Sequence, residues 1–378
     1  MASIRNYKTK SGATRYEVVY RGPDGRQRSK SFVRKIEATR FSNTVEADLA
    51  RNDWLDPQKG RAHFGELAET WLKSTTHLKP TTRQGYESIV AKHLLPKFGS
   101  RAVASIDHAE ILVFISGLTE AGAGPGTVRN IRDVTRMIFK FAVRSGAVKT
   151  NPVFDIKVPR KHPEEMMFLT PEEVMSLAAA ITKPPIRMRG GEHRRDSYPE
   201  YGTLVRLAAF TGLRAGEIVG LRAGRVDLKR NRVEVVETVT EAHGKLQFGS
   251  TKTYARRVVP VPPPIIAELA MIIDGRPEDS LIFTGPDGSV LRHSNWYPRH
   301  FKPATRVAEL DARTRFHDLR HTYAAFLIAQ NAHPRAMMER LGHSTINVTL
   351  GTYGHLLPNV EAELEGAINE LYDHAARS

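Results

Sequence analysis

The segment between Arg313 and Leu356 constrains the fold more than any other part of this 378-residue chain. Apolar residues recur at helical spacing from residue 319 to 327, so we expect a helix with His317 and Arg320 on one face. A second helical run is expected to end at Gly342 in a left-handed turn, which sets a histidine at its mouth. A tyrosine between small residues follows ten positions after that histidine. This concentration of cations and one hydroxyl favours a site for phosphate chemistry.

A second block, residues 208–218, is expected to end one apolar helix at Gly212 and to begin another at once, so that the turn presents Arg214. Taken with the first segment, the chain resembles the tyrosine recombinase (phage integrase) family. The signature of that family is a Thr-Gly-Leu-Arg-X-X-Glu block, a later His-X-X-Arg, a Leu-Gly-His box and a nucleophilic tyrosine about ten residues beyond it. All four blocks occur here in that order, as Thr211–Glu217, His317–Arg320, Leu341–His343 and Tyr353.

The resemblance implies a site that binds a DNA phosphodiester. Such a phosphate gains negative charge in its pentavalent transition state, so fixed cations must surround it. Arg214 and Arg320 are expected to supply planar guanidinium forks, which lysine would not mimic. His317 and His343 are expected to hydrogen-bond the same oxygens or to assist proton transfer. Glu217, three residues after Arg214, is expected to orient that arginine.

The resemblance also implies that Tyr353 is the nucleophile and forms a 3′-phosphotyrosine with DNA. That intermediate conserves the bond energy, so we expect no ATP, no metal and no other cofactor. A free phenol has a pKa of about 10 and needs a base at neutral pH, for which His317 is the candidate. The family carries a lysine on a β-hairpin, and Lys252 matches it as the general acid for the 5′-oxygen. The alternative of a zinc pair at His317 and His321 lacks a third ligand at a supporting spacing.

Net charge and cysteine content narrow the class of partner. Fifty-six Lys plus Arg against 41 Asp plus Glu leave a net charge of +15 and a sequence pI of about 10.0, which indicates a polyanionic partner. An ordinary basic protein is the alternative. Cysteine is absent, which is compatible with a reducing compartment. No apolar run suits a signal sequence or a membrane span, so we expect a cytoplasmic, nucleoid-associated protein of a bacterial host.

Residues 1–60 are expected to form a small basic β domain with one helix. Alternating β-branched and aromatic residues flank the turn Gly22–Gly25, which is typical of a hairpin, and a helix is expected from Ile36 to about Trp54. Eleven Lys or Arg against three acids fall within residues 1–40, so the segment resembles the arm-binding domain of many integrases. A charged surface on a structural domain is the alternative. The candidate DNA contacts here are Arg15, Arg26 and Arg28.

Residues 61–153 change to helical periodicity and are expected to form a four-helix, SAM-like core-binding domain. Hydroxyls and a cation after Pro80 lie at a helix start, where backbone N–H groups favour phosphate, although a plain helix cap at Thr81 is equally compatible. A second basic set lies at near-helical spacing on the last helix, and a solvated face is its alternative. The candidate DNA contacts are Thr81, Thr82, Arg83, Arg129, Arg132 and Arg136.

Residues 154–167 are interpreted as an extended basic linker, and residues 168–378 as the catalytic domain. Thr170 is expected to cap its first helix, with Pro171 at the first helical position. One β-rich part is expected between residues 225 and 261, with strands over residues 226–228, 232–239 and 258–261. The amphipathic C-terminal tail is expected to dock either on a neighbouring protomer or on its own domain. The loop expected over residues 183–201, ahead of the block that contains Arg214, has no assigned role.

The sequence therefore predicts a multidomain, mainly α fold with small β-sheets. The resemblance implies a site-specific DNA recombinase, an integrase, that acts on double-stranded attachment-site DNA at core and arm sites as a homotetramer. It would integrate a phage or mobile element, with a directionality factor (excisionase) for excision and a host DNA-bending protein as further expected partners. The alternatives are a type IB topoisomerase, which shares the chemistry, and a DNA-binding regulator or architectural protein with a vestigial catalytic set.

Overall fold

The computed structural model describes residues 2–159, 165–183, 197–250 and 256–357, with the exception of 52, 53, 55 and 57. Two compact units make up the chain, Met1–Pro163 and Glu164–Ser378. Lys252, the expected tail and most of the expected loop before the arginine block lie outside the described residues. None of the described helices has the length and apolar character that crossing a bilayer requires.

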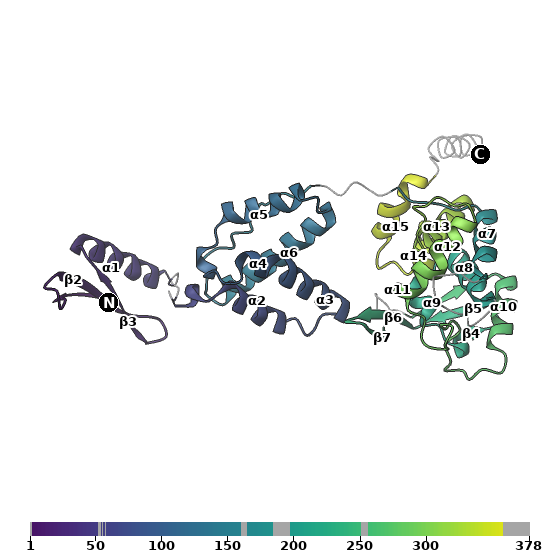
Figure 1. Cartoon of the computed structure of the whole chain (residues 1–378), viewed down its shortest axis with the longest axis horizontal. Coiled ribbons are helices and arrows are strands. Elements are labelled where there is room, and N and C mark those ends of the chain that lie inside the picture. Colours follow the sequence, from purple (N-terminus) through teal and green to yellow (C-terminus); the bar gives the residue numbers. More distant parts are fainter. Residues whose placement is uncertain are drawn as a thin grey trace, which may run out of the picture. The chain divides into compact units, whose positions relative to one another are not determined.

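The first unit begins with a three-stranded antiparallel sheet that one helix covers on a single face (Figure 1). Its elements are β1 (Ser3–Lys8), β2 (Thr14–Arg21), β3 (Gln27–Phe32) and α1 (Lys35–Ala50). Val18 and Tyr20 of the central strand form a core cluster with Ala38 and Val45 of the helix. Because side chains alternate along a strand, Arg15 lies on the opposite, uncovered face of the sheet.

Helix α1 ends at Ala50, earlier than the expected end at Trp54. The Trp54 indole instead packs edge-on against Tyr20, with ring centroids 6.2 Å apart. The Arg28 guanidinium lies over the same indole, 4.7 Å from the ring centroid. Because the sheet offers this aromatic and cationic surface, the chain leaves the helix and folds the indole back onto it.

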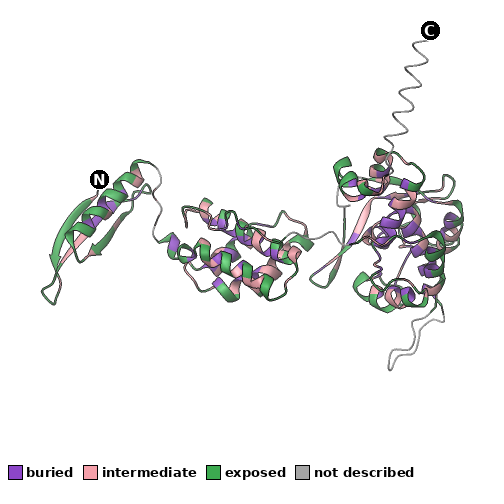
Figure 2. Cartoon of the chain, turned by 90° about the horizontal axis from the view of Figure 1, so that it is seen from above, coloured by how far each residue is buried: buried purple, intermediate pink, exposed green. Residues whose placement is uncertain are grey.

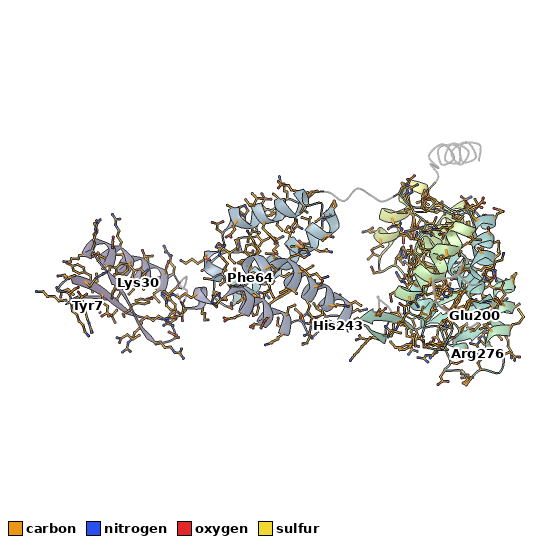
Figure 3. The ribbon with its side chains drawn as sticks, viewed as in Figure 1. Tyr7, Lys30, Phe64, Glu200, His243 and Arg276 are labelled. Atoms are coloured by element: carbon orange, nitrogen blue, oxygen red, sulfur yellow. The ribbon has the colours of Figure 1, made fainter. Side chains whose placement is uncertain are left out.

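The rest of the first unit is helical, and Phe64, labelled in Figure 3, lies in its core. The Phe64 ring packs against those of Phe98 and Phe139. Its longer helices are α2 (Phe64–Lys73), α3 (Pro80–Ile89), α5 (His108–Glu120) and α6 (Pro125–Arg144). Its short elements are η1 (Lys59–Arg61), η2 (Val90–Leu94), α4 (Leu95–Phe98) and η3 (Val103–Ser105). Lys79, not Thr81, is the N-cap of α3, and no side chain caps that helix, so the cap interpretation of Thr81 is wrong.

The second unit packs helices around α8 (Pro199–Thr211), most of whose residues are buried. Figure 2 shows buried residues gathered in the interior of this unit. Its N-terminal helices are α7 (Pro171–Ile181), α8 (Pro199–Thr211), α9 (Ala215–Val219) and η4 (Ala223–Arg225). The later helices are α10 (Pro263–Ile273), α11 (His293–Trp296), η5 (Tyr297–Phe301), α12 (Lys302–Val307), α13 (Asp318–Ala329), α14 (Pro334–Leu341), α15 (Ile346–Tyr353) and η6 (Gly354–Leu356). Thr170 caps α7 in a capping box with Glu173, as expected.

The β-rich part of this unit divides into two small sheets. The strands are β4 (Val226–Asp227), β5 (Arg232–Val235), β6 (Glu237–Ala242), β7 (Lys245–Ser250) and β8 (Arg257–Pro260). One sheet has the order β4-β5-β8, and β6 and β7 form a separate hairpin. His243 lies at the tip of that hairpin, where it and Gly244 adopt φ values of 50° and 70° (Figure 3). The strand expected over residues 232–239 is therefore two strands that belong to different sheets.

Candidate active site

Two helices that end on glycine frame the site. Gly212 follows α8 with φ 65°, and Gly342 follows α14 with φ 64°. A Cβ on Gly212 would lie 2.5 Å from the Tyr323 ring, and one on Gly342 would lie 3.0 Å from the Arg257 guanidinium. Both turns therefore need glycine for their backbone conformation and for space. The sequence predicted that one helix ends at Gly212 and that the other ends in a left-handed turn at Gly342, and both predictions are confirmed. The carbonyls near each end remain available as acceptors.

Those carbonyls fix two arginines. Arg320 of α13 is 3% exposed and donates to the carbonyl oxygens of Gly212 and Leu341. Arg214, the N-cap of α9, donates to the carbonyl oxygen of Gly342 at 3.2 Å. Each guanidinium is therefore held by backbone from a distant part of the chain, and the two cations are brought to one place. Carbonyl acceptors satisfy N–H groups without cancelling the positive charge.

A buried carboxylate links Arg214 to a third arginine. Glu217 is 2% exposed and accepts from Arg214 at 2.9 Å, and from the two terminal nitrogens of Arg257 at 2.9 and 2.6 Å. Burial by itself would raise the pKa of Glu217, but the hydrogen bonds and charge of Arg257 outweigh it and lower the pKa to about 2. Sequence reasoning missed Arg257, which lies on β8 just after the segment that contains Lys252.

Tyr353, the last residue of α15, lies near Arg320 and Arg214. Tyr353 is 2% exposed, and its hydroxyl is 2.9 Å from Nδ1 of His321. The His343 ring is stacked on Tyr353 at an interplanar angle of 14°, and its Nδ1 is 2.8 Å from the Thr349 hydroxyl. His317 packs edge-on against His321, with ring centroids 4.9 Å apart. His321 and Thr349 are therefore two polar members of the site that the sequence did not single out for this chemistry.

The surroundings set the protonation states of these groups. Burial, with Arg320 and Arg214 nearby, lowers the pKa of His343 to about 4. Burial also lowers the pKa of His321. Partial loss of hydration, together with the nearby His321 and Arg320, lowers the pKa of His317. Part of the His317 side chain remains open to solvent, and screening by that water weakens the shift. Burial raises the pKa of Tyr353 against the opposing effect of Arg320 and Arg214. At neutral pH the histidines are uncharged and the phenol keeps its proton.

Among the catalytic candidates, the structure gathers six at this site and leaves one undescribed. The six are Arg214, Glu217, His317, Arg320, His343 and Tyr353. Lys252 lies outside the described residues. Tyr323 is 5% exposed and packs in one apolar cluster with Tyr353.

The DNA-contact candidates of the first unit differ in how far they are already paired. Arg28 is bound by Asp24 at 2.8 Å and by Asp56 at 2.6 Å, so its guanidinium holds the small β domain together. Arg26 is exposed in the β2–β3 turn, and Thr81 and Thr82 are exposed in the first turn of α3. Arg83 pairs with Glu87 at 3.0 Å.

The three arginines of α6 line one groove with the chain segment that follows it. Arg129, Arg132 and Arg136 face Lys157 and its neighbours across this groove. Arg132 is bound to Asp133 at 2.6 Å and to the Ile156 carbonyl oxygen at 3.2 Å. Arg129 and Arg136 are exposed, and they therefore present their charge to solvent.

The helical fold and the cluster of arginine, histidine and tyrosine are those of a tyrosine recombinase. The sequence model of the phage integrase family matches residues 167–359, and that of the phage integrase central domain matches residues 64–158. The chain belongs to the phage integrase family. The ICEBs1 integrase of Bacillus subtilis (strain 168) is 27% identical over 305 residues, 78% of each protein. The putative prophage phiRv2 integrase of Mycobacterium tuberculosis (strain H37Rv) is 26% identical over 377 residues, 95% of this chain and 94% of that protein.

Solved structures share the fold. The Tn1549 transposon integrase in complex with a circular intermediate DNA superposes with a TM-score of 0.66 at 20% identity, over 82% of this chain and 99% of that chain. A lambda integrase tetramer bound to a Holliday junction superposes with a TM-score of 0.57 at 17% identity, over 90% of this chain and 95% of that chain. The chain is thus a recombinase with the multidomain, mainly α fold that its sequence predicted.

Proposed function

We propose that this recombinase cleaves and rejoins attachment-site DNA through a 3′-phosphotyrosine on Tyr353, and so integrates a phage or mobile element. The observation that carries the proposal is the position of Arg214 and Arg320. Both are fixed by carbonyls at the ends of two glycine-ended helices, next to the apolar cluster in which Tyr353 is buried. A preorganised pair of cations next to a buried hydroxyl is suited to a phosphate whose charge increases in the transition state.

The reaction exchanges one phosphate ester for another. The Tyr353 oxygen forms a bond to phosphorus as the bond from phosphorus to the 5′-oxygen breaks. Arg214 and Arg320 hold the non-bridging oxygens, and the neutral rings of His317 and His343 each have an N–H to donate to them. Lys252 gives a proton to the departing 5′-oxygen. Glu217 and Arg257 position Arg214. Attack by a 5′-hydroxyl on the phosphotyrosine reverses these steps, so ligation needs no ATP and no metal.

DNA recognition is proposed to divide between the two parts of the first unit. The exposed Arg129 and Arg136, with Thr81 and Thr82 at a helix start, suit the backbone of core-site DNA. The uncovered face of the N-terminal sheet, which carries Arg15, suits the groove of arm-site DNA.

Assembly and location complete the proposal. We propose that four protomers exchange strands between two duplexes in the bacterial cytoplasm, with a directionality factor for excision and a host protein that bends the DNA. The lambda integrase tetramer on a Holliday junction and the lambda integrase dimer on its core site have the same fold, which supports this assembly.

The test is covalent capture on a nicked duplex that carries the attachment core. Wild type should form a band that survives denaturing electrophoresis, and Tyr353→Phe should lose it. Tyr323→Phe is the matched control, because Tyr323 is buried in the same cluster and its hydroxyl only accepts from Arg340 at 3.2 Å. If wild type shifts this DNA in a native gel yet forms no adduct, the nucleophile assignment is wrong. Recombination between two sites then separates an integrase from a topoisomerase.

A further inference from the structure

His321 has no role in the reaction outlined above, yet it holds the hydrogen bond to the nucleophile. It lies on α13 one turn after His317, is 9% exposed, and places Nδ1 2.9 Å from the Tyr353 hydroxyl. Its ring meets the phenol at an interplanar angle of 66°, with centroids 5.7 Å apart. This is a direct contact between an imidazole nitrogen and the atom that attacks phosphorus.

The other histidines of the site and Arg320 are not placed to accept the proton of Tyr353. His343 presents its ring face to the phenol, since the two rings are nearly parallel, and its Nδ1 is paired with Thr349. His317 packs on His321 and is exposed toward solvent. Arg320 is a donor only and is bound to two backbone carbonyls. Among the described residues, the geometry therefore singles out His321 as the acceptor for the phenolic proton.

We propose that Nδ1 of His321 accepts the proton of Tyr353 as the tyrosine oxygen bonds to phosphorus. The inference rests on the proposed function, because it assigns the proton of the same nucleophile. The P–O5′ bond breaks in the same step, and the 5′-oxygen takes its proton from Lys252. When the 5′-hydroxyl of a strand attacks in the reverse direction, His321 returns the proton to the departing phenol. His317 is then free to hydrogen-bond the phosphate.

The charges around His321 allow a neutral acceptor before cleavage. Arg315 and Arg320 disfavour a second proton on the ring, whereas the buried Asp318 in the first turn of α13 favours it. His317 and Tyr353 are the titratable groups in ring contact with it. A bound DNA phosphate adds negative charge next to the two site arginines, which stabilises the imidazolium that forms. The ring therefore starts as a base and is supported as a cation only when substrate is present.

Two variants separate proton transfer from positioning. His321→Asn places an amide oxygen near the position of Nδ1, so it keeps a hydrogen-bond acceptor but no base. His321→Leu removes both. Lys252→Ala serves as the reference for loss of the general acid. Each is measured as the single-turnover rate of adduct formation on two nicked duplexes, one ordinary and one with sulfur in place of the bridging 5′-oxygen at the scissile phosphate. A thiolate leaves without a proton, so only nucleophile activation remains in the second substrate.

His321→Asn should slow adduct formation roughly 100-fold or more on both duplexes, the range of a general base, whereas Lys252→Ala should recover on the sulfur duplex. The rate of His321→Asn should also rise about tenfold per pH unit above neutrality, because the phenol must then ionise without help. A structural role for His321 would not change that slope. A rate within threefold of wild type, or recovery on the sulfur duplex, overturns the proposal.

Controls distinguish a failure of the proposed function from a failure of the His321 assignment. If wild type forms no adduct, or if Tyr353→Phe still forms one, the proposed function itself fails. If Tyr353 is the nucleophile and only the His321 results disagree, the function stands and the base lies elsewhere. Thermal unfolding and native-gel binding check that each variant is folded, and His321→Gln replaces His321→Asn if the latter unfolds early. The pH slope of the folded variant then decides the outcome.

Discussion

Arg320 and Arg28 are both largely buried arginines, but their partners differ in kind. Arg320 in the second unit donates to two backbone carbonyls. Arg28 in the N-terminal sheet, with 14% of its side chain exposed, is bound by the carboxylates of Asp24 and Asp56. Carbonyl dipoles satisfy the donors of a guanidinium and leave its charge, whereas carboxylates cancel that charge. The first arrangement prepares a cation for a phosphate, and the second stabilises a fold.

The same contrast in charge distinguishes the arginines of the active site from the arginines of α6. The Glu217 carboxylate binds the guanidiniums of Arg214 and Arg257, and Arg320 lies close enough to feel its charge. Three cations near one carboxylate leave positive charge at the site. On α6, Arg132 is neutralised by Asp133, while Arg129 stays exposed. A buried cation excluded from water acts strongly on a nearby phosphate, and an exposed one acts weakly and is screened by salt. The two regions should therefore respond differently to substitution.

The largest effect is expected at Arg320. Arg320→Lys keeps the charge but cannot reach both carbonyls and the phosphate with a planar fork, so the single-turnover cleavage rate should fall about 100- to 1,000-fold. Arg206→Lys is the matched control, because Arg206 is an arginine of the same unit that only pairs with Glu268 at 2.6 Å. It should stay within about threefold of wild type. Equal losses of cleavage rate in the two variants would show that an arginine held by carbonyls matters no more for cleavage than one held by a carboxylate.

A smaller but still large effect is expected at the turn that holds Arg320. Gly212→Ala forces a left-handed alanine and a Cβ only 2.5 Å from Tyr323, so the free energy of unfolding should fall by about 3–4 kcal/mol. Gly244→Ala has the same sign of φ with no atom within 4 Å, and should lose only about 1 kcal/mol. Chemical denaturation of both variants measures the difference. Similar losses would mean that close packing at Gly212 contributes nothing.

Glu217 should make a pH-dependent contribution to the free energy of unfolding. Its pKa of about 2 in the folded protein is below that of an unfolded glutamate, so its contribution is present above about pH 5 and is lost as the pH falls toward 2. At neutral pH this contribution is at most about 3 kcal/mol. Unfolding free energies of wild type and Glu217→Gln should therefore converge between pH 5 and pH 2. A constant difference over this range contradicts the burial of a charged carboxylate at this position.

The smallest effects are expected in the first unit. Arg129→Gln removes one exposed cation, so the affinity for core-site DNA should fall severalfold and the slope of log affinity against log salt should decrease by about one. Arg28→Gln should instead lower the melting temperature of the N-terminal domain without changing that slope. Binding titrations at several salt concentrations, together with calorimetry, separate the two. If Arg28→Gln changes the salt slope and leaves stability intact, Arg28 contacts DNA after all.

The helix ends and caps of the second unit were readable from local sequence. Glycine at 212 and 342 favours a left-handed helix end, and Thr170 before Pro171 favours a helix start, because each preference acts within a few residues. Local reasoning was wrong where a distant surface decided the outcome. Helix α1 ends early because Trp54 packs on Tyr20. The strand expected over residues 232–239 divides because its two halves pair with different partners.

The chemistry of the site shows the same division. The ordered motif blocks predicted Arg214, His317, Arg320, His343 and Tyr353 as one group, and the structure gathers them. Nothing in the sequence placed His321 rather than His317 against the Tyr353 hydroxyl, because the rotation of α13 relative to α15 depends on how these helices pack. Nor did it pair Arg257 with Glu217, since β8 reaches that carboxylate only in the folded unit.

The sequence alone determined the family, the succession of helices and small sheets, and the residue types that phosphate chemistry requires. These depend on composition, periodicity and motif order, which can be read along the chain without knowing which segments are in contact. Only the tertiary structure decided which cations keep their charge and which lose it to a carboxylate, and which imidazole touches the nucleophile. Those outcomes depend on contacts between segments far apart in the chain, where burial and hydrogen-bond partners are set by packing.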